Sequence, residues 1–203
     1  MSSREVWYVS YGSNLSRERL NCYLAGGRPP GALRAQPGAR DARPPAEDRP
    51  VELSGRLYFW GASTTWEGAT AFYDHHSPGP TAARAYRVTV AQLTDIAEQE
   101  MHREPRSGSA LEAVLNRGFV GSYRAGPGRY ETMVHVGTLD GLPMYTFTSP
   151  HRAGTSPHAA PSEPYLAMIR AGLAESHGWD RERADTYLSR WLPRRAPYRA
   201  SLR

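Results

Sequence analysis

The 203-residue sequence contains no lysine, and all 25 of its Lys/Arg-type basic residues are arginine. A site without lysine can use neither a Schiff base nor a lysine general base. The sequence also has a single cysteine, Cys22, which excludes an internal disulfide and a zinc site built on several cysteines. We therefore expect a reducing, cytoplasmic location.

Long apolar runs are missing too. No stretch approaches the ~18 residues of a membrane span, and the N-terminus lacks the charged-then-apolar pattern of a signal peptide. We therefore expect no membrane association.

Several catalytic motifs are absent: the sequence has no H-E-x-x-H, no P-loop, no dinucleotide fingerprint and no G-x-S-x-G. Ser13 stands in Y-G-S-N, with no neighbouring histidine to indicate a triad. Asp74-His75-His76 is the one cluster that suggests a metal, but adjacent histidines on a strand face opposite sides, which favours a turn or surface role. No metal or organic cofactor is expected.

The net charge is +5 and the isoelectric point is about 9.5. The arginines are scattered, and they are dense only in a basic C-terminal tail from about residue 193. Such tails are more often solvated or packed against a partner than used to contact bases, so nucleic acid is the less favoured partner.

Length and composition predict one domain over residues 1–203, with long loops at about 28–50 and 149–164. Three predicted strands follow one another without intervening helices, which favours a largely antiparallel or mixed sheet. A hairpin is expected around Asp140-Gly141. The expected strands cover 6–11, 51–60, 69–73, 83–90, 129–136 and 142–147; the expected helices cover 16–24, 91–102, 109–116, 162–173 and 180–192.

The stretch from Val6 to Leu15 is the starting point for predicting a site. Residues 6–11 are β-branched or aromatic apart from one serine, as in a buried strand, and Gly12-Ser13-Asn14 then breaks the run. A strand that ends in small residues just before a helix leaves backbone N–H groups free to bind an anion or a carbonyl oxygen. The alternative is an ordinary tight turn.

The predicted helix at 91–102 separates two nearby acids. At helical spacing Glu100 falls between Leu93 and Ile96, within the apolar stripe, whereas Glu98 falls on the opposite face with Asp95, Gln99 and His102. We expect Glu98 to be a solvated surface charge and Glu100 to point inward, where acids with perturbed pKa values gather at active sites. The alternative for Glu100 is a salt bridge to one of the many arginines.

Two strings resemble the γ-glutamylcyclotransferase-like (AIG2-like) family: Tyr11-Gly12-Ser13-Asn14-Leu15 in the first strand and loop, and Glu98-Gln99-Glu100 in the helix. A strand that begins with tyrosine at Tyr130, and P-S-x-x-Y ending at Tyr165 followed by I-x-x-G, are similar as well. The sequence departs from the family at Met101-His102-Arg103, where glycine usually follows the glutamate, and residues 102–128 are longer than usual.

The resemblance implies an α+β fold in which a mixed, largely antiparallel, β-barrel-like sheet is flanked by helices. It also implies an enzyme that needs no cofactor. The α-amine of a small-molecule γ-glutamyl amide attacks its own γ-carbonyl, which gives 5-oxoproline and a free amine. By this resemblance Glu100 is the catalytic acid/base, and the substrate-binding residues are Tyr11, Gly12, Ser13, Asn14, Leu15, Tyr130 and Tyr165.

Three points stay open at this stage: the identity of the leaving amine, the role of the loops that shape that side of the pocket, and the choice between monomer and homodimer. Two other functions also remain. The same fold could act as an amide lyase or acyltransferase in secondary metabolism, or it could be a non-catalytic small-molecule-binding module.

Overall fold

A computed structural model describes residues 4–193 of the chain. Its strands are β1 (Glu5–Ser10), β2 (Glu47–Ser54), β3 (Arg56–Ser63), β4 (Gly68–Asp74), β5 (Pro80–Thr89), β6 (Ser122–Arg124), β7 (Thr132–Leu139) and β8 (Leu142–Thr148). Its helices are η1 (Ser13–Leu15, a 3-10 turn), α1 (Arg17–Ala25), α2 (Val90–Glu100), α3 (Ala110–Arg117), α4 (Glu163–His177) and α5 (Arg181–Ser189).

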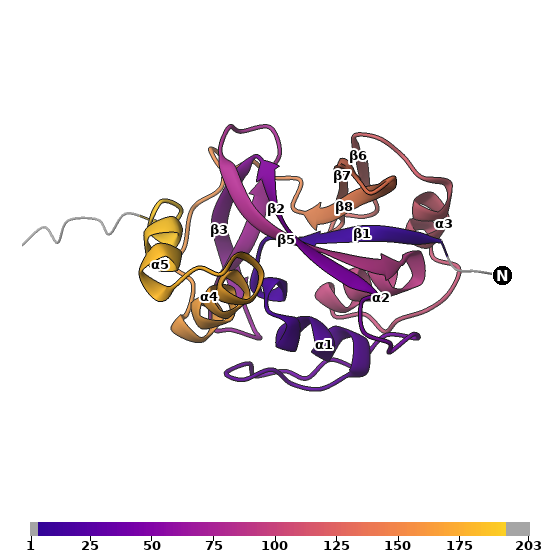
Figure 1. Cartoon of the computed structure of the whole chain (residues 1–203), viewed down its shortest axis with the longest axis horizontal. Coiled ribbons are helices and arrows are strands. Elements are labelled where there is room, and N and C mark those ends of the chain that lie inside the picture. The colour runs from indigo at the N-terminus through magenta and orange to yellow at the C-terminus, as the bar shows by residue number, and fades with distance from the viewer. Residues whose placement is uncertain (1–3, 194–203) are drawn as a thin grey trace, which may run out of the picture.

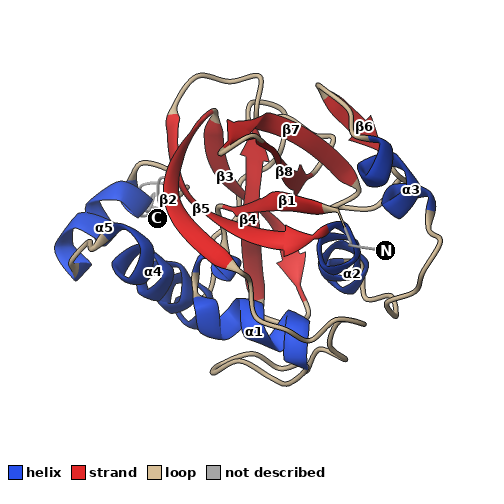
Figure 2. Cartoon of the chain, turned by 45° about the vertical axis from the view of Figure 1, so that its right-hand side comes forward, coloured by secondary structure: helices blue, strands red, loops and turns tan. Residues whose placement is uncertain are grey.

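Six strands form one mixed sheet in the order β2-β5-β1-β8-β7-β6, while β3 and β4 pair separately. Only the β1–β8 pair is parallel among the described strand pairs; the others are antiparallel. The predicted α+β class with a mixed, largely antiparallel sheet and flanking helices is confirmed. The sheet is open, with β2 and β6 at its edges, and does not close into a barrel. Figure 2 shows the strands at the centre of the molecule and the helices around them.

β1 lies inside the sheet and is covered on both faces. Trp7 and Val9 belong to one apolar cluster, which reaches β3, β4, α4 and α5, whereas Val6 and Tyr8 belong to a second cluster, which includes α1, α2 and α3. A strand that is buried on both faces carries a continuous apolar run and not an alternating one, as residues 6–11 do. Figure 1 shows the two groups of helices at opposite ends, with α4 and α5 at one end and α3 at the other.

The single strand expected at 51–60 is two strands in different sheets, and they separate at Gly55. A Cβ at this glycine would clash with the ring of Tyr73, whose hydroxyl donates a hydrogen bond to the Ser54 carbonyl (2.9 Å). The change of sheet therefore depends on a close approach between distant residues, which strand periodicity cannot reveal.

The loop expected at 28–50 ends earlier, because β2 begins at Glu47. β2 contains Pro50, and because β2 is an edge strand the missing N–H is tolerated there. The second loop covers 149–162 in place of the expected 149–164, since α4 begins at Glu163. The basic tail predicted from about residue 193 lies almost wholly outside the described residues.

The hairpin of β7 and β8 turns at Asp140 and Gly141, whose φ angles are 48° and 76°. Both angles are positive, as a two-residue type I′ turn requires, which agrees with the predicted turn. Tyr130, expected to begin a strand, instead lies in a turn two residues before β7.

None of the helices within residues 4–193 has the length and apolar character that crossing a membrane would require.

Candidate active site

The turn after β1 is the short helix η1. The Leu15 N–H donates to the Gly12 carbonyl (3.0 Å), and the Ser16 N–H donates to the Ser13 carbonyl (3.1 Å). The N–H groups of Ser13 and Asn14, by contrast, open the turn and have no backbone acceptor. The Ser13 N–H lies beside the Tyr165 hydroxyl, where it lowers the pKa of that group against the larger effect of burial.

Leu15 faces away from the site that was predicted for it. Its side chain is fully buried in the core, and its N–H is already used inside the turn. Its carbonyl accepts hydrogen bonds from the Tyr86 hydroxyl (2.9 Å) and from Arg84 Nη1 (2.9 Å). Leu15 therefore holds the turn in place from behind.

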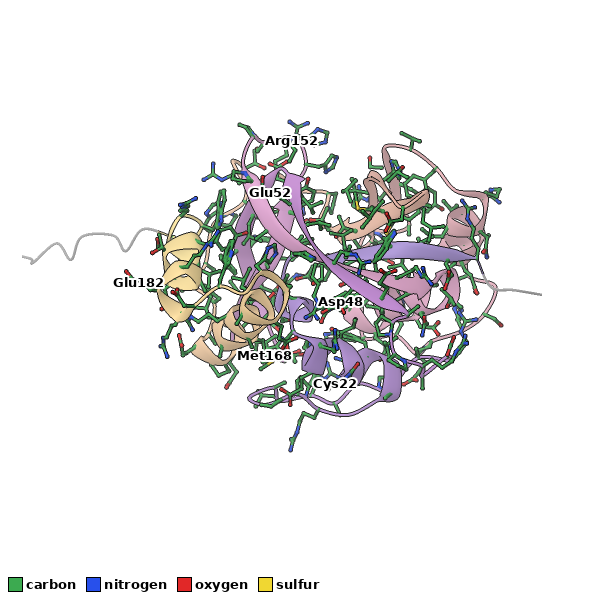
Figure 3. The ribbon with its side chains drawn as sticks, viewed as in Figure 1. Cys22, Asp48, Glu52, Arg152, Met168 and Glu182 are labelled. Atoms are coloured by element: carbon green, nitrogen blue, oxygen red, sulfur yellow. The ribbon has the colours of Figure 1, made fainter. Side chains whose placement is uncertain are left out.

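Arg84 is the buried centre of an ionic network behind the turn. It is 2% exposed, and its guanidinium also bonds to Asp48 (2.9 Å from Nε) and to Glu175 (2.7 Å from Nη1). In the view of Figure 3, Asp48 lies between Cys22 on α1 and Glu52 farther along β2. The network connects β2, β5 and α4 to the back of the turn.

On the other side of the turn lies a cavity of about 370 Å³. Its walls come from β1, the turn, α1, the segment between β3 and β4, the end of α2, the segment before β7, and α4. Seven of the eight predicted site residues line it: Tyr11, Gly12, Ser13, Asn14, Glu100, Tyr130 and Tyr165.

Glu100, the last residue of α2, is half-buried at this cavity. Its Oε1 accepts hydrogen bonds from the Tyr23 hydroxyl (2.6 Å) and from Asn14 Nδ2 (3.2 Å). Asn14 thus joins the carboxylate to the opening turn. Within residues 4–193 Glu100 makes no salt bridge, so the alternative of an arginine pair does not apply in the described part of the chain.

The expectation that Glu98 is a solvated surface charge is wrong. Glu98 is 5% exposed and pairs with Arg103, which also bonds to Glu131 (2.6 Å). Asp95 and Gln99, placed on the same face, are buried as well. The long segments before β2 and after α2 cover this polar face, and helical periodicity cannot foresee a loop that folds over it.

Loop contacts on the polar face of α2 are specific. Arg40 donates to the Asp95 carboxylate from its backbone N–H (2.9 Å) and from Nε (3.0 Å). Gly38 donates to Gln99 Oε1 (3.2 Å), and Gln99 Nε2 in turn donates to the Tyr23 carbonyl (2.9 Å). These bonds fix the end of α2, and with it the position of Glu100, against α1.

Tyrosine hydroxyls around the cavity remain protonated at neutral pH. Burial raises the pKa of Tyr11, Tyr23 and Tyr130 well above the usual value, with the nearby Glu100 carboxylate adding to the effect at Tyr23 and Tyr130. Burial likewise raises the pKa of Tyr165 to about 12. The pKa of Tyr8 is raised by burial and by Glu100.

Three of these hydroxyls are tied to the surrounding backbone. Tyr11 donates to the Phe147 carbonyl (2.7 Å), Tyr130 bonds to the Ala71 carbonyl (3.0 Å), and Tyr165 accepts from the Ala71 N–H (2.9 Å). A Cβ on Gly12 would lie 3.1 Å from the Tyr165 hydroxyl, so glycine lets the turn approach this wall. The three rings are therefore fixed walls of the cavity.

Arg19 and Tyr23 line the cavity too, although no site role was predicted for either. Arg19 Nη2 donates to the Tyr23 hydroxyl (2.5 Å), which in turn donates to Glu100. The available signal was their spacing: residues four apart on a helix lie on one face. Nothing in that spacing shows that the face is directed at Glu100.

The departure at Met101-His102-Arg103 affects the cavity wall. Met101 and His102 line the cavity, and His102 has a positive φ of 58° where the chain leaves α2. Burial and the nearby Arg34 lower the pKa of His102, so its imidazole is neutral at neutral pH. Arg34 and Arg129 also line the cavity.

His75 and His76 lie in the turn after β4, with ring centroids 3.9 Å apart, and so do not face opposite ways. The Asp74 carboxylate accepts hydrogen bonds from the His76 N–H, the Ser77 hydroxyl and the Ala153 N–H. Asp74 therefore has the turn role that was expected. Across residues 4–193, no three His, Cys, Asp or Glu side chains are grouped so that they could hold a metal ion.

No protein-family model matches the chain. Among curated proteins it is similar to histone deacetylase 5 of Arabidopsis thaliana, with 28% identity over 204 residues. The alignment covers 92% of this chain and 30% of the plant protein, so the chain spans less than a third of the length of that relative.

Two solved structures resemble the fold. One is a gamma-glutamyl cyclotransferase, with a TM-score of 0.54 and 18% identity over 96% of this chain and 92% of the other. The second is an uncharacterized human protein, with a TM-score of 0.54 and 20% identity over 95% of this chain and 91% of the other. The chain therefore has a γ-glutamyl cyclotransferase-like fold.

Proposed function

We propose that the chain is an enzyme that cleaves a γ-glutamyl amide by internal cyclisation, which gives 5-oxoproline and a free amine. The observation that carries the proposal is the position of Glu100, whose carboxylate is hydrogen-bonded to Asn14 of the opening turn within one cavity of about 370 Å³. The γ-glutamyl cyclotransferase-like fold supports the same reaction class.

In the proposed reaction, the substrate's α-amine forms a bond to its own γ-carbonyl carbon, and the bond from that carbon to the leaving nitrogen breaks. The α-nitrogen loses one proton to Glu100 before it attacks and a second as the ring closes, and both protons pass through Glu100 to the departing nitrogen. The products are 5-oxoproline and a protonated amine, and the carboxylate is regenerated. Attack within one molecule needs mainly a bent substrate conformer and a proton carrier. Tyr23 and Asn14 hold the carboxylate in position for both transfers.

The carbonyl oxygen develops negative charge as the ring closes. The Asn14 N–H, which has no backbone acceptor, would stabilise this charge together with the Ser13 N–H beside the Tyr165 hydroxyl, typically by a few kcal/mol per donor. Leu15 is left out of this role because its N–H is bonded to Gly12.

The test is incubation of the protein with γ-glutamyl amino acids, glutathione and γ-glutamyl amines, with 5-oxoproline measured by mass spectrometry. We expect Glu100→Gln to lower the rate by about 10²–10⁴-fold, the usual contribution of a general acid–base group. The free energy of unfolding should change little, since glutamine can still accept the bonds from Tyr23 and Asn14. Glu104→Gln, an exposed acid just beyond α2, is the matched control and should keep full activity.

An unchanged rate in Glu100→Gln would move the proton carrier elsewhere. Absence of 5-oxoproline from every substrate would instead favour the alternative of a small-molecule-binding module. Release of an amine without 5-oxoproline would favour an amide lyase or acyltransferase that uses the same turn and acid.

A further inference from the structure

Arg19 is a buried cation, and not all of its hydrogen-bond donors have an acceptor. It is 3% exposed and lines the cavity, yet its Nε and Nη1 have no hydrogen-bond partner among residues 4–193. Within the same residues it makes no salt bridge, and Nη2 donates to the neutral Tyr23 hydroxyl. A buried charge without an opposite partner is costly, and such groups are usually paired.

The guanidinium is also held in one place. It lies 4.2 Å from the centroid of the Tyr23 ring and 5.5 Å from that of Trp66, distances typical of cation–π contacts. The Trp66 ring packs in turn against Tyr165 (5.4 Å between centroids), another wall of the cavity. A planar fork of donors fixed in this way matches the geometry of a carboxylate.

A second unpartnered polar atom lies close by. Asn14 is 4% exposed, and its Oδ1 has no hydrogen-bond partner among the described residues, while its Nδ2 donates to Glu100 and to the Tyr8 hydroxyl (3.0 Å). Two residues that line the cavity thus carry buried polar atoms without a partner among the described residues: two donors on Arg19 and, on Asn14 beside the Glu100 carboxylate, one acceptor.

We propose that Arg19 binds the α-carboxylate of the γ-glutamyl group, while Asn14 Oδ1 and Glu100 receive the α-ammonium. This assignment rests on the proposed function for the identity of the ligand. Arg19 and Glu100 bond to the same Tyr23 hydroxyl, so they lie within two hydrogen-bond lengths of each other. The ammonium and carboxylate of an α-amino acid stand on one carbon and fit this spacing. The site would thus select substrates that keep a free α-amino acid head.

The test compares two ring compounds that differ only in the carboxylate, 5-oxo-L-proline and 2-pyrrolidinone, by NMR titration or calorimetry. We expect the wild-type protein to prefer 5-oxoproline. Arg19→Met should weaken 5-oxoproline binding by about 10- to 100-fold, the size of a lost charge-assisted bond, and leave pyrrolidinone binding unchanged. Arg19→Lys, which keeps the charge, should recover part of the loss. Arg17→Met changes an exposed arginine of the same helix and should alter neither affinity.

Turnover gives an independent measure with γ-L-glutamyl-L-alanine and 4-aminobutanoyl-L-alanine, which lacks the carboxylate but closes the same five-membered ring. We expect Arg19→Met to lower kcat/KM only for the first. An equal loss on both compounds would mean that Arg19 acts by holding Tyr23, and no loss on either would mean that it does not contact the carboxylate; each result overturns the assignment.

The two proposals can fail separately. If no γ-glutamyl amide gives 5-oxoproline but binding of 5-oxoproline still depends on Arg19, the reaction is wrong and the carboxylate site stands. If 5-oxoproline is formed and Arg19→Met binds it as well as the wild type does, the reaction stands and the carboxylate site is wrong.

Discussion

Two buried arginines lie on opposite sides of the opening turn. Arg84, behind the turn, is 2% exposed and has two carboxylates, a backbone carbonyl and the face of Tyr86 (4.9 Å to the ring centroid) as partners. Arg19, on the cavity side, is 3% exposed and has one hydroxyl and two aromatic faces as partners. The two side chains are equally buried, so burial alone does not distinguish them.

The difference lies in which donors are satisfied. Arg84 donates hydrogen bonds to other groups of the protein, as a structural ion pair does. Arg19 has two guanidinium nitrogens, Nε and Nη1, that have no acceptor among the described residues. A group that remains unsatisfied inside a cavity is costly for folding and is retained most readily when a ligand uses it. The turn between the two arginines is thus held in place on the Arg84 side and can contact a ligand on the cavity side.

The largest expected effect on stability is at Arg84. Arg84→Met leaves Asp48 and Glu175 without their shared cation. We expect the free energy of unfolding to fall by about 3 kcal/mol, which is the low end for a broken buried ion pair because both carboxylates are partly exposed. Arg19→Met removes no carboxylate partner, so its free energy of unfolding should change by less than about 1 kcal/mol. Urea denaturation of both variants measures the two changes in unfolding free energy. Equal losses would mean that the two arginines do not differ in their structural role.

A somewhat smaller effect is expected at Gly172 of α4, which lies directly against the back of the turn. A Cβ there would clash with the backbone and side chain of Leu15, so Gly172→Ala should cost about 2 kcal/mol despite the better helix propensity of alanine. Because the turn must shift, formation of 5-oxoproline should fall as well. Gly154→Ala, where a Cβ meets no atom within 4 Å, is the control. An active, stable Gly172→Ala would show that the turn is not fixed from behind.

The smallest effect per group concerns alkaline pH, at which the absence of lysine leaves tyrosine as the main titrating side chain. Burial raises the pKa of Tyr86 beside Arg84 and of Tyr23 beside Arg19, although each arginine opposes the shift. The unfolded chain loses these protons near pH 10, while the folded chain keeps them. Above that pH, stability should fall by about 1.4 kcal/mol per pH unit for each buried tyrosine, until its folded pKa is reached.

Urea unfolding between about pH 8 and pH 11 gives this slope. Tyr23→Phe and Tyr86→Phe should each reduce the slope of the unfolding free energy against pH by the contribution of one tyrosine. A slope that stays the same in both variants would mean that the arginines, and not burial, determine the ionisation of these hydroxyls.

Sequence alone predicted those elements whose signals are local, and the types of residue at the site. The apolar run at 6–11, the break at Gly12 and the turn pair at Asp140-Gly141 predicted β1, a turn after it and the β7–β8 hairpin, because each depends on backbone preferences over a few neighbouring residues. The inward position expected for Glu100 came from helical spacing, and the residue does line the cavity.

Only the tertiary structure decided which groups meet. Glu98 is buried because distant segments cover the polar face of α2, and the strand at 51–60 divides because Tyr73 packs against Gly55. Arg19 and Glu100 share the Tyr23 hydroxyl because α1 packs against α2. Local periodicity gives the direction of a side chain relative to its own helix or strand. What lies opposite that side chain, and which donors stay free there, depends on contacts between residues far apart in the chain.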